Sequence, residues 1–154
     1  MIDLGLCFTY TYSAGTFADY HEAVTVAAIS ANYIDLDAAG IRPVGGSKPP
    51  WLVVWSITVF ATMVSMGIKL ITDSVIPALD AVTADDVMVT RFTAAVMAAN
   101  TLLINQPLPA FKYKQYLALE YEPYTNGTGS ILAYLSTGPE TAITAPANTV
   151  EAGT

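Results

Sequence analysis

Apolar and polar residues along this chain follow the period of β-strands. The clearest alternation covers residues 115–121, where Leu117, Leu119 and Tyr121 lie on one face of an extended segment. A period of two is typical of a strand with one buried face. The other segments with an alternating or short apolar pattern are 51–60, 64–72, 87–92, 100–105 and 130–135.

The segments between these runs carry turn residues. Residues 23–36 suggest two short strands, the first with Val24 and Val26 on one face, separated by a break at 30–32. Residues 38–50 contain three glycines and three prolines, which predicts a long surface loop. Asn126-Gly127 precedes the last strand and predicts a hairpin that joins residues 115–121 to residues 130–135.

These patterns predict an all-β fold. Seven or eight short strands without a convincing helix indicate a single jelly-roll-like β-sandwich, and 154 residues suffice for one domain. We expect the sandwich at 21–138, an extended N-terminal arm at 1–20 and a flexible C-terminal tail at 139–154, because both termini lack a regular apolar period.

One uncharged stretch allows another interpretation. The twenty residues between Lys48 and Lys69 are long enough to span a bilayer as a helix. They are rich in Val, Ile and Thr and follow Pro49-Pro50, which favours two strands. A membrane span at 49–68 is therefore an alternative hypothesis.

Composition narrows the classes of partner. Six basic and thirteen acidic residues give a net charge of −7, which argues against binding to nucleic acid. Only 12% of residues are charged and 53% are hydrophobic, whereas soluble domains have about 25% charged residues. Such a surface needs to be covered, either by other protein subunits or by lipid.

Residues suited to catalysis or metal binding are few. Cys7 is the only cysteine, so the chain can form neither an internal disulfide nor a metal site with several thiolates. His21 is the only histidine, and its neighbours match no signature of a catalytic triad. The acidic pairs Asp35/Asp37 and Asp85/Asp86 lack the remaining ligands of a calcium loop. Glu120 and Glu122 either face a groove as a carboxylate pair or discourage pairing as charges on an edge strand. We expect no catalytic residue, metal or cofactor, and no enzyme activity.

Several short blocks, in a fixed order from about residue 20 to residue 138, carry a family resemblance. The chain resembles the tailed-phage capsid cement (decoration) proteins of the Bordetella phage type. The blocks are Glu22-Ala23-Val24-Thr25, residues 30–40, the glycine-rich loop, Trp51-Leu52-Val53-Val54, Gln106-Pro107-Leu108-Pro109, residues 114–121 and Ile131-Leu132-Ala133-Tyr134-Leu135.

The resemblance implies a jelly-roll protein of the virion. Such a protein binds the outer face of an icosahedral shell and clamps adjacent subunits of the major capsid protein, so its partners are that protein and its own copies, as a homodimer rather than a homotrimer. It would occupy the host cytoplasm during assembly and the capsid surface afterwards, and it would bind neither nucleic acid nor a membrane. The acidic start of the chain is in keeping with this location, because a signal for general export would begin with Lys or Arg. Aromatic residues and arginines concentrate interface energy, so we expect contacts from Tyr10, Tyr12, Phe17 and Arg42. A carbohydrate-binding β-sandwich used for adsorption is a further alternative.

Overall fold

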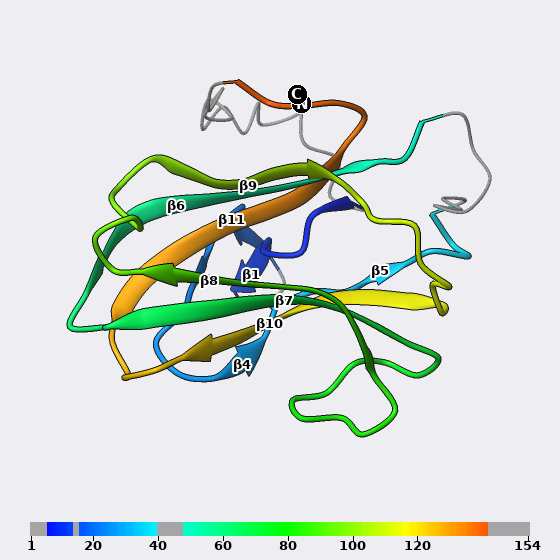
Figure 1. The fold of residues 1–154 in the computed structure, drawn as a ribbon, viewed down its shortest axis with the longest axis horizontal. Coiled ribbons are helices and arrows are strands. Elements are labelled where there is room, and N and C mark those ends of the chain that lie inside the picture. Colours follow the sequence, from blue (N-terminus) through cyan, green and yellow to red (C-terminus); the bar gives the residue numbers. More distant parts are fainter. Residues whose placement is uncertain (1–5, 14–15, 40–47, 142–154) are drawn as a thin grey trace.

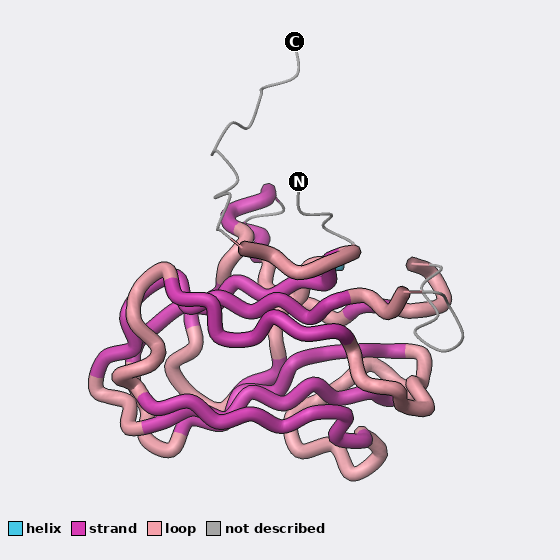
Figure 2. Tube along the Cα trace, turned by 45° about the horizontal axis from the view of Figure 1, so that its top comes forward, coloured by secondary structure: helices cyan, strands magenta, loops and turns pink. Residues whose placement is uncertain are grey.

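The computed structural model describes residues 6–13, 16–39 and 48–141, and they form two antiparallel sheets packed face to face (Figures 1 and 2). The predicted all-β sandwich is confirmed. The first sheet has the order β3 (Glu22–Ala23), β11 (Thr128–Ser136), β6 (Trp51–Ala61), β9 (Thr101–Pro107). In the second sheet, β4 (Ala28–Ile29) and β5 (Ile34–Asp35) both pair with β10 (Tyr116–Pro123), followed by β7 (Ser65–Asp73) and β8 (Asp85–Thr93). A separate hairpin consists of β1 (Thr11–Ser13) and β2 (Thr16–Asp19).

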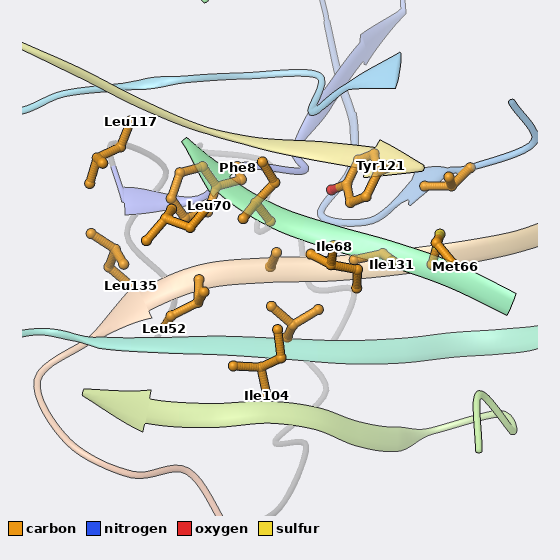
Figure 3. Close-up of a cluster of buried hydrophobic side chains, with 14 of the residues drawn as sticks. Phe8, Leu52, Met66, Ile68, Leu70, Ile104, Leu117, Tyr121, Ile131 and Leu135 are labelled. Atoms are coloured by element: carbon orange, nitrogen blue, oxygen red, sulfur yellow. The ribbon is translucent and has the colours of Figure 1, made fainter. Parts of the chain in front are cut away.

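The core lies between the inner faces of the two sheets (Figure 3). The alternation at 115–121 is confirmed, because Leu117, Leu119 and Tyr121 are fully buried in this core. The register sets Leu119 of β10 opposite Leu70 of β7, and both side chains face the first sheet. Burial of alternate residues from each long strand therefore holds the two layers together.

Part of the predicted N-terminal arm belongs to this packing. Phe8 is fully buried in the main core, and its backbone N–H donates to the Ala133 carbonyl at 2.9 Å. Cys7 forms an isolated bridge with Tyr134, and the Thr9 hydroxyl donates to the Tyr20 carbonyl at 2.7 Å. Residues 7–9 thus lie against β11, whereas residues 142–154 of the predicted tail lie outside the described residues.

The predicted Asn-Gly hairpin is wrong. Residues 124–127 do connect β10 to β11, but these strands belong to different sheets, so the connection crosses the sandwich. The crossing brings backbone close to neighbouring segments, and a Cβ atom on Gly127 would lie 2.6 Å from the Ala61 carbonyl oxygen. Gly127 therefore permits a close approach between two connections, which is a different requirement from a two-residue turn.

Two further expectations need correction. Residues 24–27, predicted as part of a strand, form the loop between β3 and β4, with Val24 buried and Val26 exposed. Glu120 and Glu122 do not lie on an edge strand, because β10 has β7 on one side and β4 and β5 on the other. Neither the alternation at Val24 and Val26 nor the charges of Glu120 and Glu122 reveal strand pairing, because pairing depends on distant partners.

Residues 49–68 include β6 and the beginning of β7, which lie in different sheets. Within the ranges that the structure describes, no helix is long and apolar enough to cross a membrane. Residues 51–61 and 65–68 thus form strands, as the β-branched pattern of this stretch favours, and not a single helix.

Candidate protein interface

Four connections meet at one end of the sandwich, where the chain passes between strands or between sheets (left in Figure 1). We call this region the arch end and define it as residues 24–27, 57–65, 93–100 and 123–128. All four of its connections cross from one sheet to the other, after β3, β6, β8 and β10. The strand order therefore brings together residues that lie far apart in the sequence.

Hydrogen bonds tie the arch end into one unit. The Ala94 N–H donates to the Val64 carbonyl at 3.1 Å, and the Tyr124 N–H donates to the Ser65 carbonyl at 2.8 Å. The Gly127 N–H reaches the Thr25 carbonyl at 3.2 Å, and the Val64 N–H donates to the Thr125 hydroxyl at 3.0 Å. Because each connection is fixed by its neighbours, the surface is ordered before any partner binds.

The surface of the arch end is apolar and uncharged. Large hydrophobic side chains are exposed on every connection, with exposed fractions of 49% for Val26, 58% for Val59 and Val64, 50% for Val96 and 74% for Tyr124. The residues of the arch end include no Asp, Glu, Lys, Arg or His. Exposed apolar groups without charge are typical of the central part of a protein interface.

Charged residues begin where the arch end stops, on the outer face of the second sheet. Arg91 lies 3.8 Å from Glu122 (Nη2 to Oε2), and Lys69 lies 3.2 Å from Glu120 (Nζ to Oε1). Lys69 also pairs with Glu122. The pKa of Lys69 is raised, chiefly by its hydrogen bond to Glu122 and further by its contacts with Glu120. Burial of Lys69 opposes this shift. Lys69 thus pairs with both glutamates, and the two carboxylates share one ammonium group in an ion-pair network.

None of the four predicted contact residues belongs to the segments of the arch end. Tyr10 is half-buried and packs, with Tyr20, on a second apolar cluster outside the first sheet. The backbones of Tyr12 and Phe17 pair across the β1–β2 hairpin, and Arg42 lies outside the described residues. The second cluster consists of Cys7, Val53, Trp55, Leu132 and Tyr134.

Other titratable groups have structural partners. His21 lies 2.9 Å from Asp19 (Nε2 to Oδ2), and Asp35 Oδ1 accepts hydrogen bonds from the N–H groups of Asp37 and Ala38. Lys114 lies 3.0 Å from Asp85 (Nζ to Oδ2). Among the described residues, no group of three or more His, Cys, Asp or Glu side chains could hold a metal ion.

Sequence reasoning missed the arch end because no single segment reveals it. Each of its four segments is short and free of charge, which is a visible signal in the sequence. That signal becomes informative only once the topology places the four segments side by side. Comparison with known protein families and with curated proteins finds no match to this chain.

Proposed function

We propose that the chain is a capsid cement protein that binds the outer face of an icosahedral shell and clamps adjacent major capsid protein subunits. The order of the sequence blocks between about residue 20 and residue 138 supports this proposal. The structural observation that carries it is the ordered, uncharged arch end, because such a surface can join two copies of the chain into a dimer that clamps neighbouring shell subunits. Affinity for the assembled shell over free subunits then stabilises the particle by mass action.

The jelly-roll fold is part of the same proposal. If β4 and β5 count as one strand, the strands from β3 onward number eight, in the spatial orders 1-8-3-6 and 2-7-4-5. Pairing of the first strand with the last, and of the second with the seventh, is what winding a long hairpin into two sheets would produce. Viral capsid proteins use this architecture.

Homodimer formation through the arch end fits the charge distribution. Two copies that each carry a net charge of −7 repel one another when charged surfaces meet. The arch end lets two copies approach without burying a charge, and a two-fold contact brings the same patch from both copies together. We therefore assign the arch end to contact between copies.

The carbohydrate-binding alternative would favour aromatic rings gathered in one platform. Tyr33 and Tyr124 are exposed, with exposed fractions of 42% and 74%. Tyr33 packs edge-on against Tyr116 at the start of β10, and Tyr124 follows the end of the same strand. They lie at opposite ends of the sandwich, which favours the structural function.

The test uses empty shells assembled from the major capsid protein of the virus that encodes the chain. We expect the purified chain to sediment with these shells, to saturate at a fixed ratio of copies to capsid subunits, and to raise the temperature at which the shells open. Binding to dissociated capsid subunits should be weaker than binding to shells. Absence of sedimentation with shells, or equal affinity for free subunits, would refute the proposed function.

A further inference from the structure

The connection between β7 and β8 exposes an apolar surface at the end of the sandwich opposite the arch end. Residues 74–84, here called the apolar loop, leave β7 at Asp73 and return at Asp85 (lower right in Figure 1). The exposed fractions are 56% for Val75, 58% for Ile76, 42% for Leu79 and 100% for Val82. Leaving four large hydrophobic side chains in water on one short loop opposes the general preference for burying them.

Asp73 fixes both ends of this loop. Its side chain is fully buried, and Oδ1 accepts hydrogen bonds from the N–H groups of Ser74 at 2.7 Å and Val75 at 3.4 Å. Oδ2 accepts a hydrogen bond from the Thr83 hydroxyl at 2.8 Å, across the loop. Lys114 adds a second fastening, because its Nζ donates to the Thr83 carbonyl at 2.6 Å and pairs with Asp85 at 3.0 Å.

A buried carboxylate is costly, and its use here indicates that the conformation of the loop matters. Among the residues that the structure describes, the side chain of Asp73 makes hydrogen bonds only to the two ends of the loop. A loop that served only as a connection could be polar and loosely held. A loop whose two ends are fixed has already lost part of the conformational entropy that docking would otherwise cost.

The surroundings of the loop define the chemistry of the partner. An open hollow of about 490 Å³ lies beside the loop. Its lining includes Val82 and Phe111, the carboxylates of Asp80, Asp85 and Asp86, and Lys69 with its ion-pair partner Glu120. Lys114 pairs with Asp85, whereas Asp80 and Asp86 have no ion-pair partner among the described residues. An apolar projection bordered by carboxylates complements an apolar groove bordered by Lys or Arg side chains.

We propose that the apolar loop is the docking element by which each copy inserts Ile76, Leu79 and Val82 into an apolar groove, bordered by basic residues, on the surface of the capsid shell. This inference rests on the proposed function and adds the element that grips the shell. In a dimer joined through the arch ends, the two apolar loops lie at the two far ends of the dimer. Each dimer thereby spans two shell subunits, as a clamp requires.

Sedimentation with empty shells tests the loop directly, with the double variant Ile76→Ser/Val82→Ser. Both side chains are exposed, so the fold should not change, and Val89→Ser on the outer face of β8 is a matched control with an exposed fraction of 55%. We expect binding of the double variant to weaken at least about tenfold, since truncated interface anchors commonly have this effect, and Val89→Ser to bind like the unsubstituted chain. Equal binding by all three proteins would overturn the loop assignment while leaving the proposed function intact. Failure of the unsubstituted chain to bind shells would overturn both.

Asp80→Asn/Asp86→Asn tests the chemistry of the border. We expect weaker binding to shells and a smaller decrease of binding when salt is added, because fewer ion pairs form with the basic border. Unchanged affinity together with unchanged salt dependence would overturn the basic border. The competing occupant is a lipid surface, so vesicles of phosphatidylcholine and phosphatidylglycerol in a 3:1 ratio serve as a second probe. Binding to vesicles that is lost in Ile76→Ser/Val82→Ser, with shell binding unchanged, would overturn a protein partner.

Asp73→Asn tests whether docking requires a fastened loop or only the exposed apolar side chains of the loop. We expect faster hydrogen exchange at Ser74 and Val75 and weaker shell binding, although every exposed apolar side chain is retained. If hydrogen exchange accelerates and shell affinity stays constant, rigidity of the loop is not required for docking.

Discussion

The phenol of Tyr121 donates a hydrogen bond of 2.8 Å to Oε1 of Glu22, and this contact joins the two sheets at one edge. Tyr121 is fully buried in β10, and Glu22 lies in β3 of the other sheet. The second carboxylate oxygen, Oε2, accepts the N–H of Ala31 at 2.7 Å. One side chain thus connects β3, β10 and the segment after β4.

Glu22 makes the stability of the fold depend on pH near neutrality. Burial, opposed by the hydrogen bonds from Tyr121 and Ala31, raises the pKa of Glu22 from 4.5 to about 7. The folded chain therefore holds this proton more tightly than the unfolded chain. Stability from this group is fully present below pH 4.5, decreases as pH rises, and is lost above about pH 7. The free energy of unfolding should fall by at most about 3 kcal/mol across this range.

Urea denaturation between pH 5 and pH 8 measures this effect. Glu22→Gln keeps a neutral side chain of the same shape, so its free energy of unfolding should vary less with pH than that of the unsubstituted chain. Glu140→Gln is the control, since it makes the same change of side chain at a carboxylate outside this contact. An identical slope in Glu22→Gln and the unsubstituted chain would show that another group titrates.

At acid pH, Asp73 should make the stability of the fold depend on pH in the opposite direction to Glu22. Although burial acts to raise it, hydrogen bonds from Thr83, Ser74 and Val75 and the charge of Lys114 hold the pKa of Asp73 below its ordinary value of 3.8. Its contribution to stability is present above that value and is lost as pH falls further through the lowered pKa.

Asp73→Asn removes this acid dependence and destabilises the chain at pH 7, by about 2 kcal/mol on the usual scale for hydrogen bonds to charged groups. Chemical denaturation at pH 7 and at pH 3 measures both effects. Asp80→Asn, on the exposed part of the same loop, should leave the free energy of unfolding unchanged. If Asp73→Asn is as stable as the unsubstituted chain at pH 7, the buried carboxylate does not fasten the loop.

Phe8 provides a test of whether the N-terminal segment belongs to the folded domain. Its ring is fully buried in the main core, and its carbonyl accepts the N–H of Asn32 at 2.8 Å. Phe8→Ala should cost about 3–5 kcal/mol, as for other buried phenylalanines. Thermal denaturation measures the loss, with the fully exposed Val82→Ala as control. A loss below about 1 kcal/mol would indicate that residues 6–10 detach easily in solution.

The sequence was informative about strands and uninformative about their partners. Residues 51–60, 64–72 and 115–121 were predicted as strands, and the structure has β6 at Trp51–Ala61, β7 at Ser65–Asp73 and β10 at Tyr116–Pro123. Alternation records which side of a strand is buried, so these segments could be found. The same alternation is found in two strands joined by a hairpin and in two strands that belong to different sheets. The sequence therefore predicts a hairpin at Asn126-Gly127, where the chain crosses from one sheet to the other.

The interface candidates were missed for a similar reason. Val59, Val64 and Val96 are of a residue type that is usually buried, and the sequence does not reveal that they are exposed. Their exposure follows from the positions of the connections in the fold. Phe8 was placed in an arm because its neighbours lack a regular period, although its ring fills a space between the sheets. Burial that depends on contacts across the whole chain, such as the bridge from Cys7 to Tyr134, leaves no local pattern.

The arch end should govern dimer formation, and its exposed side chains allow a test that leaves the fold intact. Val64 and Tyr124 have exposed fractions of 58% and 74%, so polar replacements there remove apolar contact area without opening a cavity. We expect the unsubstituted chain to sediment as a dimer and Val64→Ser/Tyr124→Ser to dissociate at least about tenfold more readily, since aromatic residues near an interface centre often contribute 2 kcal/mol or more. Sedimentation equilibrium over a range of concentrations measures the dissociation constant, with Val89→Ser as the matched control. Because the contact buries no charge, the dissociation constant should change little between low and high salt. A dimer that persists in the double variant, or that strengthens steeply at low salt, would place the contact between copies on a different surface.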